Sequence, residues 1–174
     1  MSAIDYDLSI IRGVAFDLDG VLSPSTVPTA PDGMPVRMVN IKDGYALQLA
    51  VKCGLQIAII TGATGRGIAE RYNSLGINDV FMGAAWKTHV FENWLSMRGL
   101  KAEEVAYVGD DVPDYEVMKH VGLAVAPADA CPDVKAIARY ISSCRGGYGV
   151  ARDLLEQILR AQGQWMSHVR AFGW

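Results

Sequence analysis

Cysteine and histidine are scarce in this sequence of 174 residues, and their spacing excludes several kinds of site. The three cysteines show no CxxC spacing, so the sequence indicates neither a disulfide framework nor a zinc site. The three histidines form no HExxH pair and stand apart from other candidate metal ligands. We therefore assign no chemistry to these residues, which are Cys53, Cys131, Cys144, His89, His120 and His168.

Long basic and long apolar runs are also missing. Sixteen Lys and Arg stand against nineteen Asp and Glu, and no basic run could neutralise a nucleic-acid backbone. No apolar stretch reaches the roughly 18 residues of a membrane-spanning helix. Residues 1–7 are polar, where a secretory signal needs a cationic start and an apolar core. We expect a cytoplasmic protein with neither nucleic acid nor membrane as a partner.

The composition that is present fits one α/β domain. The chain is 51% hydrophobic, and at about 150 residues per domain its length suits a single domain, residues 1–174. Short apolar runs alternate with helical patterns, which predicts a doubly wound, Rossmann-like parallel sheet. The runs cover residues 10–17, 55–60, 105–108 and 122–126, and the helical patterns cover 43–53, 66–75, 86–98 and 113–120. Ligands bind at the carboxyl ends of such strands, where this sequence has Asp17, Thr61 and Asp110.

Two segments interrupt the alternation. Residues 23–40 hold four of the seven prolines and a Pro-Asp-Gly turn, which is typical of a projecting β-hairpin and too short for a second domain. Residues 146–174 begin with a Gly-rich stretch, continue as an amphipathic helix and end in an aromatic tail. Exposed aromatic side chains in that tail, Trp165, Phe172 and Trp174, would indicate a subunit contact.

Asp17 and Asp19 place two carboxylates on one face of the first strand end, which suits a divalent cation. Asp17 can attack phosphorus while Asp19 protonates the leaving oxygen and later deprotonates water. A solvated strand end explains this pair alone equally well. Thr61 and Gly62 can bind a phosphoryl oxygen or cap a helix, and Lys87 can neutralise phosphoryl charge or lie in solvent.

The segment Gly109-Asp110-Asp111-Val112-Pro113-Asp114 places three carboxylates directly after an apolar run. Such carboxylates repel one another unless a cation offsets their charge, and Mg²⁺ is the natural choice for an all-oxygen ligand set. A capped helix start is the alternative.

Taken in order, these motifs resemble the haloacid dehalogenase superfamily of phosphohydrolases. The resemblance narrows to the 3-deoxy-D-manno-octulosonate 8-phosphate (KDO 8-phosphate) phosphatases, small proteins with a hairpin in place of a cap domain. It rests on residues 17–22, 40–45, 58–62, 105–114, 146–153 and 161–163, together with Lys87. The chain departs from these relatives at Ala63, where they usually carry arginine.

The resemblance implies a role for each matching residue. Asp17 becomes the nucleophile that forms an aspartyl-phosphate, and Asp19 becomes the general acid and base. Thr61, Gly62 and Lys87 hold the phosphoryl group. Mg²⁺ binds to Asp17, the backbone carbonyl of Asp19 and Asp110, with Asp111 close to the metal and Asp114 orienting Lys87. Asn40, Asp43, Arg66 and Arg152 are candidate substrate-binding residues, Arg152 for the substrate carboxylate or as a solvated residue at a helix start.

The resemblance also implies a homotetramer whose subunits help to close each other's sites, and KDO 8-phosphate as the substrate, used in lipopolysaccharide precursor synthesis. A nine-carbon sialic-acid-like 9-phosphate is the alternative substrate. A phosphoacceptor signalling domain is a more distant alternative, and the second carboxylate, Asp19, favours hydrolysis over it because Asp19 can activate water.

Overall fold

A six-stranded parallel sheet runs through the centre of the molecule in the order β3-β2-β1-β4-β5-β6. The computed structural model describes residues 4–167 and 169–173, so His168 and Trp174 lie outside the described residues. The strands are β1 Gly13–Phe16, β2 Gln56–Ile60, β3 Asp79–Phe81, β4 Val105–Val108, β5 Leu123–Ala126 and β6 Tyr140–Ile141.

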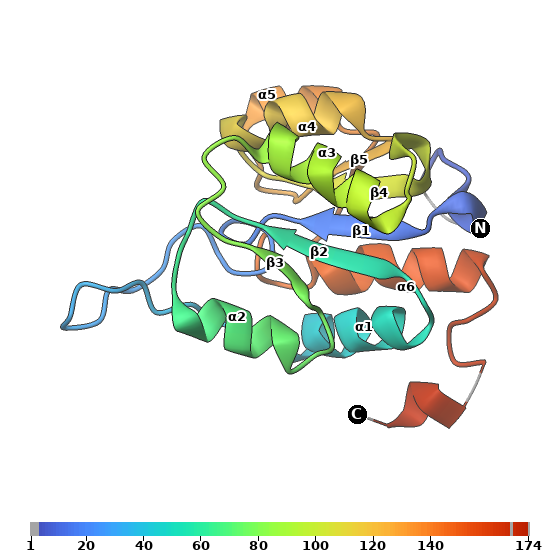
Figure 1. Cartoon of the computed structure of the whole chain (residues 1–174), viewed down its shortest axis with the longest axis horizontal. Coiled ribbons are helices and arrows are strands. Elements are labelled where there is room, and N and C mark those ends of the chain that lie inside the picture. The colour runs from blue at the N-terminus through green and yellow to red at the C-terminus, as the bar shows by residue number, and fades with distance from the viewer. Residues whose placement is uncertain (1–3, 168, 174) are drawn as a thin grey trace.

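Helices cover both faces of this sheet (Figure 1). One face carries α1 Ile41–Lys52, α2 Arg66–Asn73 and α6 Val150–Ala161, and the other carries α3 Lys87–Arg98, α4 Tyr115–His120 and α5 Pro132–Ile137. Side chains of β1 are buried on both faces of the sheet. Val14 and Phe16 pack into the apolar core on one face, and Ala15 packs into the core on the other. Such two-sided burial is characteristic of parallel strands. The predicted doubly wound α/β fold is confirmed.

The strand register brings the predicted motifs to one edge of the sheet. Phe16 pairs with Ile59 of β2 on one side and with Val108 of β4 on the other. The residues that follow these strands therefore leave the sheet together, and they include Asp17 and Asp110. After β3 the chain crosses over β2 and β1 to β4, so the strand order reverses between β1 and β4. In open α/β sheets, ligands bind at the carboxyl ends of the strands where the order reverses.

Residues 24–39, here called the hairpin segment, project from that same edge (Figure 1). An antiparallel bridge joins Thr29 to Pro35, and the turn between them places Gly33 at a positive φ of 84°. Several of its apolar side chains are about half exposed: Met34, Val36, Met38 and Val39.

The C-terminal tail folds back along α1 (Figure 1). The Tyr45 hydroxyl donates a hydrogen bond to the backbone oxygen of Ala171, and the Tyr45 and Trp165 rings meet edge to face with centroids 6.2 Å apart. Trp165 is thus partly buried, whereas Phe172 is exposed. The three cysteines form no disulfide and are partly buried, and among the described residues no helix is long and apolar enough to cross a membrane.

Candidate active site

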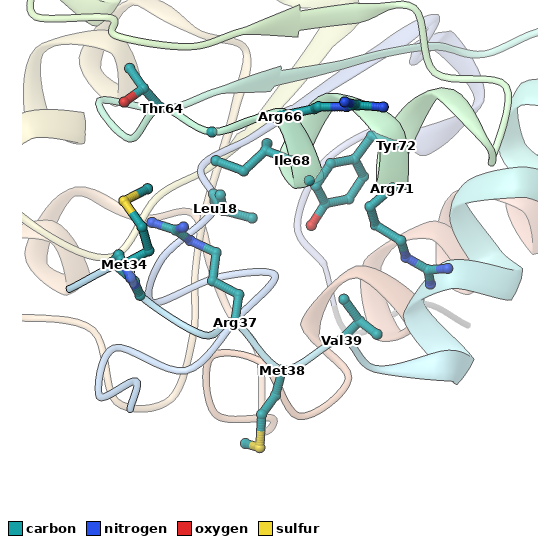
Figure 2. A pocket seen from close by; sticks show the side chains of 13 residues that line it. Leu18, Met34, Arg37, Met38, Val39, Thr64, Arg66, Ile68, Arg71 and Tyr72 are labelled. Atoms are coloured by element: carbon teal, nitrogen blue, oxygen red, sulfur yellow. The ribbon is translucent and has the colours of Figure 1, made fainter. Parts of the chain in front are cut away.

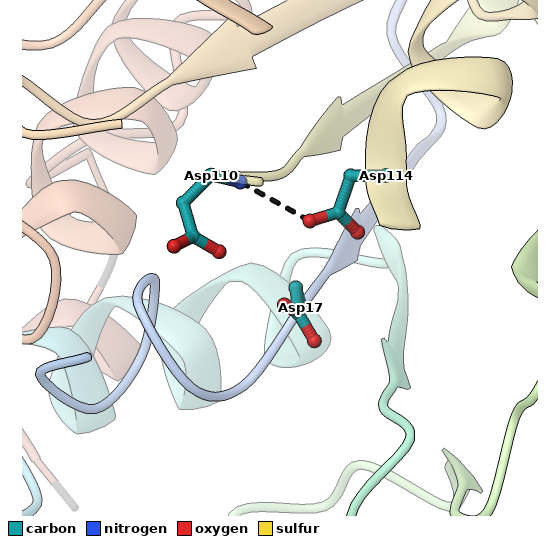
Figure 3. Close-up of side chains that lie close together, drawn as sticks. All are labelled: Asp17, Asp110 and Asp114. Carbon is teal, nitrogen blue, oxygen red and sulfur yellow. Dashed lines mark hydrogen bonds between the residues drawn. The ribbon is translucent and has the colours of Figure 1, made fainter. Parts of the chain in front are cut away.

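Three carboxylates meet at the carboxyl edge of the sheet (Figure 3). Asp17 follows β1 directly, Asp110 comes two residues after β4, and Asp114 lies in the short turn before α4. One carboxylate oxygen from each lies within 4.8 Å of those of the other two. Two separate motifs of the sequence thus form one cluster.

Lys87 links two of these carboxylates. It is the first residue of α3 and is 7% exposed, so it is not a solvated surface lysine. Its Nζ lies 2.9 Å from Oδ1 of Asp17 and 2.7 Å from Oδ1 of Asp114. The ammonium group is therefore held beside the carboxylate of Asp17.

Asp114 is fully buried, and both of its oxygens have partners. Its Oδ1 accepts hydrogen bonds from Lys87 and from the Tyr107 hydroxyl, each at 2.7 Å. Its Oδ2 accepts the backbone N–H of Asp110 at 3.2 Å. Asp114 therefore positions Lys87 and the loop after β4. The role of Tyr107 could not be predicted from the sequence, because a tyrosine inside an apolar strand carries no motif.

Burial and mutual repulsion shift the pKa values of this cluster. Burial, followed by the charge of Asp114, raises the pKa of Asp17 to about 7, against the opposing effect of Lys87. Burial and the charges of Asp114 and Asp17 raise the pKa of Asp110 to about 8. Burial alone lowers the pKa of Lys87, but Asp114 and Asp17 outweigh it and leave that pKa above its usual value. The site thus concentrates negative charge that a cation would offset.

The donor set of the cluster fits Mg²⁺. Asp17 and Asp110 offer carboxylate oxygens, the ligands that Mg²⁺ prefers, whereas Asp114 is occupied by its own hydrogen bonds. The Asp110 carboxylate lies so close to Gly20 that a Cβ atom there would overlap it. Gly20 also has a φ of +91°, which other residues rarely adopt. A glycine is therefore required where the chain passes the candidate metal site.

Asp19 follows Asp17 by two residues and is bound by an arginine. Nε and Nη2 of Arg37, in the hairpin segment, donate to Oδ1 and Oδ2 of Asp19, both at 2.7 Å. The role of Arg37 could not be predicted from the sequence, because no pattern in the hairpin segment shows which residue will face Asp19.

Thr61 follows β2 at the same edge, next to the end of β1. Its side chain is buried, and its Oγ1 accepts the backbone N–H of Ala63 at 3.1 Å. The alternative of a helix cap is wrong, because α2 has Gly65 as its N-cap residue. Gly62 is exposed in the loop that follows.

The remaining candidate residues make contacts within the fold. Asp111 is exposed and caps the turn before α4, Asn40 caps α1, and Arg66 pairs with Glu70 on the surface. Asp43 is 2% exposed, and its Oδ1 accepts the backbone N–H of Arg152 at 2.7 Å, which fixes the start of α6 against α1.

The guanidinium of Arg152 lies 4.6 Å from the Trp165 ring centroid and pairs with Glu156 at 2.8 Å. It is therefore engaged by the tail and by its own helix. The structure brings Asp17, Lys87, Asp110 and Asp114 together, and it gives Arg152 other partners.

Comparisons with known proteins identify the family. A family model described as haloacid dehalogenase-like hydrolase matches residues 73–154. The 3-deoxy-D-manno-octulosonate 8-phosphate phosphatase KdsC of Escherichia coli strain K12 is 37% identical over 154 residues, which cover 88% of this chain and 82% of that protein.

Two solved structures are closely similar as well. The first is the 3-deoxy-D-manno-octulosonate 8-phosphate phosphatase of Moraxella catarrhalis in complex with magnesium ion, phosphate ion and KDO, with a TM-score of 0.90 at 28% identity and 96% of each chain covered. The second is the cobalt-bound deoxy-D-mannose-octulosonate 8-phosphate phosphatase of Haemophilus influenzae, with a TM-score of 0.88 at 29% identity, covering 95% of this chain and 98% of that one. The chain belongs to the 3-deoxy-D-manno-octulosonate 8-phosphate phosphatases within the haloacid dehalogenase-like hydrolases.

Proposed function

We propose that this protein hydrolyses KDO 8-phosphate to KDO and phosphate through an aspartyl-phosphate on Asp17. The observation that carries the proposal is the buried contact between Lys87 and Asp17 at 2.9 Å, beside the carboxylates of Asp110 and Asp114. A lysine in this position neutralises charge on a phosphoryl group as Asp17 attacks it. The relatives named above are phosphatases for this sugar acid phosphate.

The reaction has two halves. In the first, an oxygen of Asp17 bonds to phosphorus, the bond from phosphorus to the sugar oxygen breaks, and Asp19 gives that oxygen a proton. In the second, water attacks phosphorus, Asp19 takes a proton from it, and Asp17 is released. Thr61 and the backbone N–H of Gly62 bind phosphoryl oxygens, and Asp114 and Tyr107 hold Lys87 in place.

Asp17, Asp110 and the backbone carbonyl of Asp19 are the proposed ligands of a divalent cation, with Asp111 nearby. The cation neutralises phosphate charge, a task that the acidic cluster cannot perform. We propose Mg²⁺ for this site, because its ligands are all oxygen atoms and its substrate is a phosphate. The magnesium of the Moraxella protein supports this choice, and the cobalt of the Haemophilus protein makes a metal-replacement series informative.

We further propose a cytoplasmic homotetramer formed by one domain, residues 1–174. The projecting hairpin segment and its half-exposed apolar side chains support a subunit contact. Three cysteines that form no disulfide fit a reducing compartment. Light scattering coupled to size-exclusion chromatography measures the molecular mass, and a monomer would contradict the assembly.

Phosphate release tests the proposed activity. The substrates are KDO 8-phosphate, a nine-carbon sialic-acid-like 9-phosphate and glucose 6-phosphate, each with Mg²⁺ and with a chelator. We expect KDO 8-phosphate to be preferred and its turnover to be lost on chelation. Preference for the nine-carbon substrate would reassign the specificity. A stable phosphoprotein without turnover would identify a phosphoacceptor domain instead.

A further inference from the structure

Arg37 occupies both carboxylate oxygens of Asp19. The two-point ion pair is short at both contacts, and the Arg37 side chain is only 16% exposed. Paired N–H donors on one carboxylate form one of the stronger side-chain contacts in proteins and fix the planes of both groups. The hairpin segment is thereby linked by its side chain to the end of β1.

This pair conflicts with the work that Asp19 does in the proposed reaction. Asp19 must contact the leaving oxygen of the sugar and then the attacking water. Both partners need an oxygen of the Asp19 carboxylate, and Arg37 holds both oxygens. Arg37 must therefore release or share Asp19 once the substrate is in place.

Arg37 also lines a cavity of about 330 Å³ between the hairpin segment and α2 (Figure 2). Figure 2 shows the guanidinium of Arg37 pointing toward Leu18, the neighbour of Asp19 in the chain. The side chains of Arg66 and Arg71 point away from Leu18. No acidic residue lines this cavity among the described residues. An anion that enters it meets positive charge, and Arg37 is the cationic residue shared by the cavity and Asp19.

We propose that Arg37 is a specificity-determining residue that transfers from Asp19 to the carboxylate of the sugar-acid phosphate. The substrate carboxylate, bound in the cavity, takes over the guanidinium, and this exchange frees Asp19 to contact the leaving oxygen. A phosphate ester without a carboxylate cannot make the exchange, so it binds next to an Asp19 that is still held. The inference rests on the proposed function of this site.

The exchange preserves the pairing of a largely buried charge. When Arg37 moves from one carboxylate to another, its charge-assisted hydrogen bonds are replaced by bonds of the same kind. With a neutral sugar the guanidinium would be left unpaired, and an unpaired buried charge is costly. The site therefore distinguishes substrates by the charge of a group remote from phosphorus.

A matched pair of substrates tests the proposal. KDO 8-phosphate and its carboxyl methyl ester differ in the negative charge of the carboxylate and in one methyl group, and p-nitrophenyl phosphate has a leaving group that needs no proton. Each is assayed for kcat and KM with the wild-type protein and with Arg37→Met and Arg37→Lys. Arg12→Met is the control, because Arg12 pairs with Glu104 beside β1 at the opposite edge of the sheet. Thermal unfolding checks that each variant is folded.

We expect the wild-type protein to prefer the acid over the ester by about tenfold or more in kcat/KM. Arg37→Met should reduce this preference to within about threefold, by lowering kcat/KM for the acid and raising it for the ester, since Arg37 no longer holds Asp19. The preference of Arg37→Lys should lie between those of the wild type and Arg37→Met, because lysine lacks the two-point fork. With p-nitrophenyl phosphate, which has no carboxylate and a leaving group that needs no proton, Arg37→Met should lose less kcat/KM than with the acid.

The proposal is overturned if a folded Arg37→Met protein keeps the wild-type preference for the acid. It is also overturned if all three substrates lose the same factor, which would show a purely structural role. Failure of the proposed function gives a different result, since the wild-type protein would then turn over none of these phosphate esters in Mg²⁺.

Discussion

The ammonium nitrogen of Lys87 lies 2.9 Å from Oδ1 of Asp17, and both side chains are buried. The contact joins the start of α3 to the end of β1, two positions that are 70 residues apart in the sequence. It places a cation next to the proposed nucleophile, where a phosphoryl group would add further negative charge. The proposed reaction depends on this relationship.

Replacing the nucleophile should abolish the reaction. In Asp17→Asn an amide replaces the attacking carboxylate, and we expect turnover to fall by about a thousandfold or more. The substitution is nearly isosteric and removes a carboxylate whose pKa is raised by burial, so the fold should persist. Phosphate release and circular dichroism measure the two effects. Normal turnover by the folded variant would rule out Asp17 as the nucleophile.

Removing the Tyr107 hydroxyl should reduce kcat more than it changes KM. In Tyr107→Phe, Asp114 loses one of the two donors to Oδ1, and Lys87 is less firmly directed at Asp17. We expect kcat to drop by about tenfold, which matches the loss of one hydrogen bond in the cluster. Asp114→Asn removes the charge that holds Lys87 and should cost more. If Tyr107→Phe and Asp114→Asn both kept the kcat of the wild type, the Tyr107–Asp114 contact would not support catalysis.

The metal-free protein should become less stable as the pH rises from about 4 to 8. The folded chain keeps protons on Asp17 and Asp110 up to about pH 7 and 8, whereas an unfolded chain releases them near pH 4. The folded state thus binds more protons in this window, and its stability is lost as the pH passes through the raised pKa values.

The variant Asp110→Asn isolates this effect. Without one of the repelling carboxylates, the metal-free variant should exceed the wild-type Tm at pH 9 by about 2–4 °C, the shift expected for about 1 kcal/mol. At pH 5 the two should differ little. Mg²⁺ should raise the Tm of the wild type at pH 8 and leave the variant nearly unchanged. A variant that is less stable than the wild type at pH 9 without metal would contradict the assignment of repulsion to this cluster.

Arg152 should matter for stability and not for turnover. Its guanidinium lies over the Trp165 ring and pairs with Glu156, so it fastens the tail to α6. We expect Arg152→Met to lower the free energy of unfolding by about 1 kcal/mol and to leave kcat/KM for KDO 8-phosphate within about twofold. Thermal unfolding and phosphate release measure both. A large rise in KM with unchanged stability would support the sequence-based expectation of a substrate contact.

The sequence predicted the four central strands of the sheet but not its two outer strands, β3 and β6. The runs that became β1, β2, β4 and β5 are apolar because these strands are buried on both faces. β3 has only three residues and begins with Asp79, whose carboxylate is bound by Trp94 and Arg98. β6 has two residues, too few for an alternating pattern to show, and the six-residue helix α5 was not predicted either.

Motifs with charged residues at strand ends predicted most of the site. Parallel strands that end at one edge account for the closeness of Asp17 and Asp110, whereas the contact between Asp114 and Lys87 was implied by the family resemblance. Arg37 and Tyr107 could not be found in this way, because their place in the site depends on how the hairpin segment folds back and on which carboxylate reaches a buried hydroxyl. Asp43 illustrates the reverse case, a motif residue whose burial and capping of α6 give it a structural role.

Chemical trapping of the phosphoenzyme tests the central claim most directly. The protein is mixed with KDO 8-phosphate and Mg²⁺ and quenched in acid within the first turnover. Borohydride then reduces an aspartyl-phosphate to homoserine, which mass spectrometry can locate. We predict homoserine at position 17 in the wild-type protein and none in a sample quenched without substrate. Turnover without any modification at position 17, or with homoserine at another carboxylate, would contradict the proposed mechanism.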